Sequence, residues 1–289
     1  MNHSLIKKAY EKENAMKKIL IAGGDMRNKY CSEKLSAVYS VKHINSDEEI
    51  ESEEKFDCLV LPVPPLNENK MIPAPCSDSE LEPEKIKELL KPDAIIFAGK
   101  TDDTLRNMFS GFKIFDYMDN EALSLKNAIP TAEGAVQIAL EELPVTLNGS
   151  KILITGMGRI GTSLIEILKG FGADITVAVR NAKGTANARI HGVKSICTKC
   201  IQSDYDIVFN TVPDMIFNRE LLCRFDKKTL FIDLASKPGG IDFAAALELG
   251  MKVIWALGLP GKTAPITSGE IIAETITEIL SETEENANG

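Results

Sequence analysis

The sequence predicts an α/β protein with two doubly wound parallel-sheet domains, the C-terminal one a Rossmann dinucleotide-binding domain. Short apolar strands alternate with helical segments along the chain, and one such strand runs into a G-x-G-x-x-G motif at Gly156–Gly161. The motif lies mid-chain, so another domain must occupy the first half. A length of 289 residues also suggests more than one core.

Apolar runs predict the strands of the first domain, and helical segments are expected between them. The expected strands are 17–22, 38–44, 57–61, 93–98 and 112–115, and the expected helices are 28–37, 84–90, 103–108 and 120–126. The continuously apolar runs indicate strands buried on both faces, as in a parallel sheet covered by helices. Residues 67–83 are polar and proline-rich and predict a long loop, which either lines a ligand site or is a surface excursion. We expect a flavodoxin-like substrate and catalytic domain over residues 1–130.

A connecting helix is expected over Thr131–Leu143, and it marks the domain boundary. After it, the strand-and-helix alternation repeats, so residues 131–267 are assigned to the Rossmann domain. The expected strands that follow the glycine motif are 174–179, 193–196, 206–210, 229–233 and 252–256, with helices near 219–223 and at 242–249. The last helix, beginning near Ser268, is expected to return to the first domain, which therefore includes residues 268–289.

The glycine motif predicts a pyrophosphate-binding turn. Gly156 permits the tight turn, Gly158 lets the backbone approach the pyrophosphate, and Gly161 lets the helix lie close to the strand. A helical segment is expected over 162–170, and its N-terminal N–H groups and dipole favour an anion. Arg159 and Ile160, inside the motif, are further candidates for cofactor binding.

The residues after the second strand of this domain favour NADP over NAD. An Asp or Glu usually accepts hydrogen bonds from the adenosine ribose at this point. Here the strand ends in Val179 and is followed by Arg180 and Asn181, so an acid is missing and a guanidinium can pair with a 2′-phosphate. The alternative is that Arg180 is an ordinary surface cation.

Two further strand ends are expected to lie beside the nicotinamide. Thr211, Val212 and Pro213 follow the fourth strand, and Ala235 and Ser236 follow the fifth. Pro213 can also serve simply to end its strand.

Composition excludes several classes of protein. The net charge of −9 disfavours nucleic-acid binding, and no apolar run is long enough to cross a membrane. The first 18 residues lack the apolar segment of a secretory signal, so a cytoplasmic location is expected. Cys197 and Cys200 form a lone C-x-x-C without a second half at metal-ligand spacing, so the six cysteines are expected to be free thiols and no metal site is predicted.

Several segments together resemble the larger of the two subunits of dipicolinate synthases. They occur in order along nearly the whole chain, and they are 22–27, 61–64, 129–135, 210–213, 232–240 and 257–262. The resemblance implies NADP-linked oxidation of dihydrodipicolinate, or of its 4-hydroxytetrahydro form, to dipicolinate during sporulation. It also implies that the partner is the flavoprotein-like B subunit of dipicolinate synthase, and that the protein works in the mother-cell compartment of a sporulating bacterium. The resemblance does not say whether the chain also forms a homo-oligomer.

The architecture also looks like that of D-2-hydroxyacid dehydrogenases, but two motifs differ. Ser236-Lys237 stands where those enzymes place a substrate-binding Arg, and Leu257-Gly258-Leu259 stands where they place an acid/base His. Without that His, oxidation of an alcohol lacks its usual proton acceptor.

Oxidation of a dicarboxylate ring requires cations and one base. Arg27, Lys237 and Lys262 are the expected carboxylate-binding residues, with Lys100 as a further candidate. Glu133 is the expected base because it is placed at the start of the connecting helix, and Thr131 either caps that helix or binds a carboxylate. The alternative for Glu133 is a capping-box role without chemistry.

Two other functions are compatible with the sequence. The chain can be a cofactor-binding assembly module whose partner subunit performs the redox step. It can also be an NADP dehydrogenase for another cyclic dicarboxylate or amino-acid-like substrate.

Overall fold

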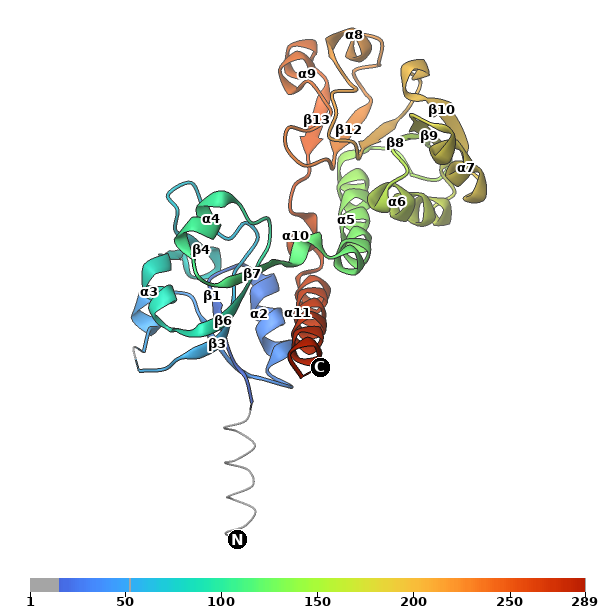
Figure 1. The fold of residues 1–289 in the computed structure, drawn as a ribbon. Helices are drawn as coiled ribbons and strands as arrows, with labels where there is room; N and C mark the ends of the chain where they lie inside the picture. The colour runs from blue at the N-terminus through green and yellow to red at the C-terminus, as the bar shows by residue number, and fades with distance from the viewer. Residues whose placement is uncertain (1–15, 52, 289) are drawn as a thin grey trace. The chain divides into compact units, whose positions relative to one another are not determined.

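Two parallel β-sheets organise the chain, and each belongs to a separate compact unit (Figure 1). We describe them from a computed structural model, which covers residues 16–51 and 53–288. The first unit runs to residue 126 and resumes at residue 264, and the second unit comprises residues 127–263. Residues 1–15, which carry most of the segment inspected for a secretory signal, lie outside the described part.

The first unit contains a five-stranded parallel sheet in the order β2-β1-β3-β6-β7, the flavodoxin-like arrangement. Its strands are β1 (Lys18–Ala22), β2 (Ser40–Ile44), β3 (Phe56–Val60), β6 (Leu90–Ala98) and β7 (Lys113–Asp116). Its helices are α2 (Met26–Leu35), α3 (Pro83–Glu88), α4 (Asp103–Met108) and α11 (Pro265–Asn288). Successive side chains of a strand point to opposite faces, so Ile19 and Ile21 pack with α2 and α11, whereas Leu20 packs with α3 and α4.

The second unit contains a six-stranded parallel sheet in the order β10-β9-β8-β11-β12-β13, the Rossmann arrangement. Its strands are β8 (Lys151–Thr155), β9 (Asp174–Val179), β10 (Lys194–Cys197), β11 (Ile207–Asn210), β12 (Leu230–Asp233) and β13 (Lys252–Trp255). Its helices are α6 (Arg159–Gly170), α7 (Ala182–Ile190), α8 (Arg219–Leu222), α9 (Phe243–Leu249) and α10 (Leu259–Thr263), together with most of α5 (Glu121–Glu142).

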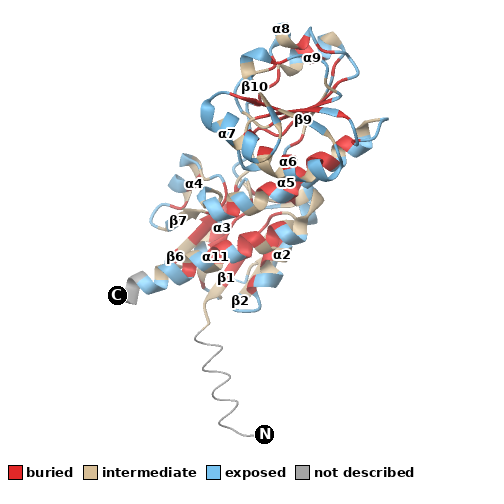
Figure 2. Ribbon diagram, turned by 90° about the vertical axis from the view of Figure 1, so that its right-hand side faces the viewer, coloured by how far each residue is buried: buried red, intermediate tan, exposed pale blue. Residues whose placement is uncertain are grey.

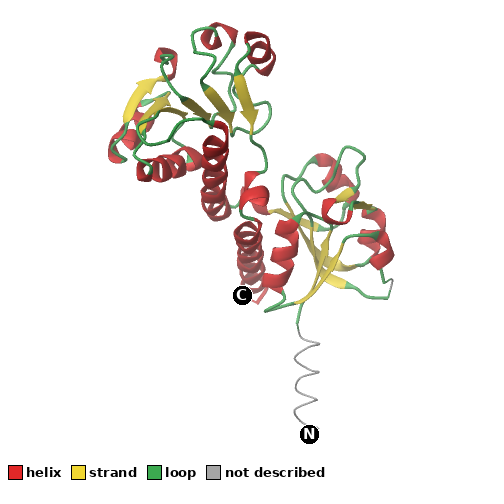
Figure 3. Ribbon diagram, turned by 180° about the vertical axis from the view of Figure 1, so that it is seen from behind, coloured by secondary structure: helices red, strands yellow, loops and turns green. Residues whose placement is uncertain are grey.

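Helices cover both faces of each sheet (Figure 3), and the buried residues concentrate in the strands and on the inner sides of the helices (Figure 2). In the second unit, Ile152 and Ile154 of β8 pack with α5 and α6, whereas Leu153 packs with α8 and α9. The predicted fold class, two doubly wound parallel sheets with a C-terminal Rossmann domain, is confirmed.

The connecting helix differs from the prediction. Two helices were expected, over 120–126 and over Thr131–Leu143, but α5 is one continuous helix of 22 residues with Pro130 inside it. Proline removes one backbone hydrogen bond from a helix interior. The hydroxyl of Thr131 donates to the Asn127 carbonyl at 2.7 Å, which adds a bond within this turn. The predictions that Thr131 caps a helix and that Glu133 lies at a helix start are therefore wrong.

One segment expected to be an irregular loop contains regular structure. Residues 67–83 include a small antiparallel sheet, β4 (Ile72–Ala74) paired with β5 (Ser79–Leu81). Ile72 and Leu81 are fully buried, which anchors this excursion to the first unit's core. A further short helix, α10, spans Leu259–Thr263.

Helix α11 returns to the first unit and lies beside α2 (Figure 1), as predicted for the last helix. The two helices approach closely at Gly269, where a β-carbon would lie 2.5 Å from the Arg27 carbonyl oxygen and 2.8 Å from Cβ of Tyr30. Only glycine fits this contact without a shift of one helix.

We expect Gly269→Ala to destabilise the first unit by about 1–3 kcal/mol, because overpacking outweighs the higher helix propensity of alanine. Thr267→Ala on an exposed position of the same helix is the matched control and should change stability by less than about 0.5 kcal/mol. Denaturant unfolding followed by circular dichroism measures both. Equal stabilities of the two variants would refute the tight contact.

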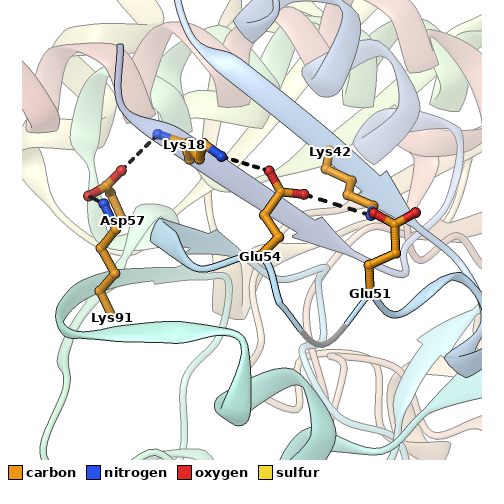
Figure 4. A network of polar contacts seen from close by, with 6 residues as sticks. All are labelled: Lys18, Lys42, Glu51, Glu54, Asp57 and Lys91. Atoms are coloured by element: carbon orange, nitrogen blue, oxygen red, sulfur yellow. Dashed lines mark hydrogen bonds and ion pairs between the residues drawn. The ribbon is translucent and has the colours of Figure 1, made fainter. Parts of the chain in front are cut away.

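A chain of alternating charges crosses the first sheet near the amino ends of its strands (Figure 4). Lys91 binds Asp57 at 2.7 Å, and Asp57 also accepts the backbone N–H of Lys18 at 2.9 Å. The chain continues through Glu54, Lys42 and Glu51. These side chains are partly exposed, so each pair contributes little to stability. The network lies at the edge opposite to the one where parallel sheets bind ligands, so we assign it a structural role.

Candidate dinucleotide site and substrate residues

A pocket of about 340 Å³ lies at the carboxyl ends of β8, β9 and β11 in the second unit. Parallel sheets with this strand order bind dinucleotides at that edge. The structure brings seven of the predicted cofactor residues together in its lining: Gly156, Gly158, Arg180, Asn181, Thr211, Val212 and Pro213.

The three motif glycines have distinct surroundings that fit a bound pyrophosphate. Gly156 has φ +91°, and a β-carbon there would lie 2.8 Å from the Thr211 hydroxyl. Nothing lies within 4 Å of the position of a β-carbon on Gly158, so the backbone is open there to a ligand. A β-carbon on Gly161 would collide with the Gly156 carbonyl oxygen, because α6 starts directly against the glycine turn. The residues present therefore fit a dinucleotide.

Two cations lie on the side of this pocket that follows β9, where proteins with this fold bind the adenosine ribose. Arg180 follows β9, and Lys183 lies in the first turn of α7. The Arg180 guanidinium is paired with the Asp214 carboxylate at 2.7 Å, but both side chains are about two-thirds exposed, so this ion pair is weak. Asn181 caps α7 by accepting the Gly184 N–H at 3.0 Å, which commits its Oδ1 atom to the helix.

Sequence reasoning missed several lining residues, which are Met157, Lys183, Gly184, Asn187 and Thr198. Lys183 was detectable, because it lies four residues after the end of β9, where the ribose-binding residues of this fold are found. Asp214 was not detectable, because its contact with Arg180 joins residues 34 positions apart.

The other predicted cofactor residues lie at neighbouring edges rather than in the pocket lining. Arg159 and Ile160 begin α6, and Ile160 packs partly on the core. Ala235 and Ser236 follow β12; Ala235 is buried and donates its N–H to Asp233, and Ser236 is exposed. Their part in cofactor binding stays a prediction.

Glu133 lies beside a different groove. This groove runs between α5 and α6 and is lined by Glu133, Val136, Gln137, Leu140, Glu141, Ile167 and Phe171. Ile167 and Phe171 lie roughly 12 and 18 Å along α6 from its start at the glycine turn. Gly134, the next residue, packs instead on Leu259 and Thr263 of α10.

The predicted carboxylate-binding lysines both lie on loops or short helices that follow strands of the second sheet. Lys237 is exposed on the turn between Ala235 and Gly240, and Lys262 lies on α10. Both therefore follow carboxyl ends of strands, the edge where ligands bind.

Arg27 lies at the equivalent edge of the first sheet, in the first turn of α2. Its guanidinium donates three bonds to the Asp25 carboxylate: Nε to Oδ1 at 2.9 Å and to Oδ2 at 3.1 Å, and Nη2 to Oδ2 at 2.8 Å. Its Nη2 also reaches the Val63 carbonyl at 3.4 Å. It therefore links the loops that follow β1 and β3, and Asp25 balances part of its charge. Lys100 follows the end of β6, where its backbone N–H donates to Asp116 at 3.1 Å.

The Asp25–Arg27 pair makes stability depend on acid pH. Burial alone would raise the pKa of Asp25, but the bonds from Arg27 outweigh burial and hold that pKa below its usual value. A lowered carboxyl pKa stabilises the folded state above the unfolded pKa of about 3.9, and this contribution is lost as the pH falls through the folded pKa.

We therefore expect Asp25→Asn to be less stable than the wild type at pH 7, with the difference shrinking below about pH 4. Unfolding of the first unit in denaturant at a series of pH values measures it, with Asp103→Asn on α4 as a control. A stability difference that is constant from pH 7 to pH 3 would contradict this account.

His43 also lies at this edge of the first sheet, near the end of β2. Its Nε2 atom is 3.0 Å from the Gly23 carbonyl oxygen, and burial lowers its pKa more than this bond raises it. Sequence reasoning missed His43 because no motif surrounds it. The pairing of β2 with β1 places it beside the glycine turn that follows β1.

All six cysteines are free, and Cys197 and Cys200 are exposed. Among the described residues, no three His, Cys, Asp or Glu side chains are grouped closely enough to hold a metal ion. None of the described helices combines the length and the hydropathy of a membrane-spanning segment.

Comparison with known proteins decides the family. Residues 18–118 match the family described as the N-terminal domain of the dipicolinate synthase A subunit. The A subunit of dipicolinate synthase from Bacillus subtilis (strain 168) is 31% identical over 242 residues, which cover 79% of each protein. The chain belongs to the family of dipicolinate synthase A subunits.

Solved structures of that family agree with this assignment. The dipicolinate synthase A subunit from Bacillus halodurans has a TM-score of 0.84 at 27% identity, covering 91% of this chain and 97% of that one. The same component of dipicolinate synthase from Bacillus subtilis has a TM-score of 0.82 at 29% identity, covering 94% and 99%.

The second unit has a family match of its own. Residues 128–241 match the D-isomer specific 2-hydroxyacid dehydrogenase NAD-binding domain. This match supports a dehydrogenase-type role and a nicotinamide dinucleotide as cofactor, in agreement with the glycine geometry.

Proposed function

We propose that this chain is the NADP-dependent oxidoreductase subunit that converts dihydrodipicolinate to dipicolinate. The observation that carries the proposal is the match to the A subunit of dipicolinate synthase over 79% of the chain. The pocket adds support for NADP, because Arg180 and Lys183 together offer two cations where a 2′-phosphate would bind.

The proposed reaction removes two hydrogen atoms from the ring. One leaves a ring carbon as hydride, which the nicotinamide accepts, and the other leaves a neighbouring ring position as a proton. The products are dipicolinate, NADPH and one proton, and the 4-hydroxytetrahydro form first loses water to enter the same step. Aromatic stabilisation of the product supplies driving force, so a modest base is sufficient.

We assign substrate roles to the cations already described. Arg27, Lys237 and Lys262 are the proposed partners of the two substrate carboxylates, with Lys100 as a further candidate. Glu133 stays the first residue to test as the base, although it lines the groove between α5 and α6 and not the pocket at the glycine turn. Glu133→Gln tests the base: a loss of kcat by about 100-fold or more supports it, and full turnover removes it from the mechanism.

The proposal also covers a partner subunit and a cellular location. The relatives are named as one component of a synthase, so we propose that the partner is the flavoprotein-like B subunit of dipicolinate synthase. We further propose that the protein acts in the cytoplasm of the mother cell during sporulation.

A second candidate is a cofactor-binding assembly module whose partner performs the redox step. The naming of the relatives as one subunit favours it, since a single subunit need not carry the whole reaction. A third candidate is a dehydrogenase for another cyclic dicarboxylate or amino-acid-like substrate.

One assay separates these candidates. Purified chain is mixed with NADP and the product of dihydrodipicolinate synthase, and the absorbance of reduced nicotinamide is followed before and after adding the B subunit. A rise without the B subunit supports the proposed function. Cofactor binding with reduction only after its addition supports the module, and turnover only on other cyclic substrates supports the third candidate.

A further inference from the structure

Three polar side chains are fully buried at the carboxyl ends of neighbouring strands in the second unit. Thr155 ends β8, Asn210 ends β11 and Asp233 ends β12, and each has 0% exposure. The Thr155 hydroxyl donates to Oδ1 of Asn210 at 2.5 Å, and Nδ2 of Asn210 donates to Oδ1 of Asp233 at 2.7 Å. Buried polar groups cost stability unless bonded, and this chain of bonds satisfies them.

Asp233 receives only uncharged donors. Besides Asn210, the backbone N–H of Ala235 donates to Oδ1 at 3.0 Å and the N–H of Gly240 donates to Oδ2 at 2.9 Å. Three N–H donors suit an ionised carboxylate, which only accepts hydrogen bonds. No described Lys, Arg or His forms an ion pair with it, so no counter-cation stands beside this buried carboxyl group.

These bonds fix the two loops expected to flank the nicotinamide. Asp233 holds both ends of the Ala235–Gly240 turn, which carries Lys237. Asn210 donates to the Val212 carbonyl at 3.0 Å, and a β-carbon on Gly240 would lie 2.5 Å from that same oxygen. The two loops are therefore packed against each other and against the buried carboxylate.

A purely structural role does not require the charge. Acceptor oxygens are what the surrounding N–H groups need, and a buried uncompensated charge costs stability. The oxidised nicotinamide ring is a cation and the reduced ring is neutral, so a fixed negative charge at this sheet edge distinguishes the two forms.

We propose that Asp233 makes the site bind the oxidised cofactor more tightly than the reduced one. Its negative charge would act from beneath the two loops that follow β11 and β12, which are expected to flank the nicotinamide. The inference rests on the proposed function, since an enzyme that consumes NADP gains from binding its oxidised form. Asp233 acts as a positioning and specificity residue rather than as a catalytic one.

The test is the ratio of the affinities for NADP and NADPH, measured by titration calorimetry and by quenching of Trp255. Trp255 is the single tryptophan of the chain, and its indole N–H donates to the Ala235 carbonyl at 3.0 Å, so its fluorescence reports on this turn. We expect Asp233→Asn to weaken NADP relative to NADPH by roughly tenfold, the usual size of one charge interaction in a protein. Thr155→Val, which breaks the same network without changing charge, should weaken both forms equally.

Asp233→Ser, which leaves room for water, replaces Asp233→Asn if that variant does not fold, and binding of 2′,5′-ADP verifies the pocket in each variant. An unchanged ratio in the neutral variants, or the same ratio change in Thr155→Val, would overturn the inference and leave the proposed function intact. Wild-type protein that binds neither NADP nor NADPH would instead refute the proposed function.

Discussion

Gly161→Ala is expected to destabilise the second unit by about 3 kcal/mol and to abolish measurable NADP binding, the effects of overpacking at the glycine turn. A β-carbon at Gly161 would collide with the Gly156 carbonyl oxygen, which is backbone and cannot turn aside. Either α6 moves away from the glycine turn or the turn loses its conformation, and both changes cost packing energy. Denaturant unfolding and calorimetric titration with NADP measure the two effects.

Gly158→Ala is the matched variant from the same motif. It is expected to weaken NADP binding without the loss of stability expected for Gly161→Ala. Nothing surrounds the added β-carbon, and the backbone of Gly158 is extended, so stability should change by less than about 1 kcal/mol. NADP affinity should still fall about tenfold or more, because the methyl group occupies the space through which a pyrophosphate approaches the backbone. Full NADP affinity in Gly158→Ala, or wild-type stability in Gly161→Ala, would contradict these assignments.

The second large effect concerns the choice between NADP and NAD. Arg180→Ala and Lys183→Ala are each expected to weaken 2′,5′-ADP binding by about 10- to 100-fold, the loss of a charge-assisted hydrogen bond. Binding of 5′-AMP, which lacks the 2′-phosphate, should change by less than about threefold, because only the phosphate needs the cations. Calorimetry at low and high salt measures both ligands, and the preference for 2′,5′-ADP should shrink at high salt.

Asp214→Asn is the control for this experiment. It removes the carboxylate that pairs with Arg180, so 2′,5′-ADP affinity should stay the same or rise. Wild-type protein that binds 5′-AMP as tightly as 2′,5′-ADP would refute NADP preference. In that case Asp214 becomes the candidate acceptor for ribose hydroxyls, as expected for NAD.

The fold was predictable because its signals are local and repeated. Continuous apolar strands at regular spacing predict parallel sheets, and the strand leading into Gly156–Gly161 identifies the Rossmann domain. Helix α5 was divided wrongly because a proline normally ends a helix, whereas Pro130 is buried inside this one.

The site was predictable in part. Residues next to strand ends could be placed, since strand order brings those ends together, and Arg180 and Thr211 do line one pocket. The Arg180–Asp214 pair and the buried Thr155–Asn210–Asp233 network could not be predicted, because each depends on side-chain directions between distant segments. Glu133 shows the same difficulty, since a helix position predicted from sequence did not determine which groove it lines.

Isotope transfer tests the central claim most directly. Dihydrodipicolinate carrying deuterium at its saturated ring carbons is incubated with the purified chain and NADP, and the reduced cofactor is analysed by mass spectrometry. The proposed function predicts one deuterium in the NADPH for each dipicolinate formed, without any other subunit. Dipicolinate formed with no deuterium in the cofactor, or deuterium transfer only after the B subunit is added, would contradict it.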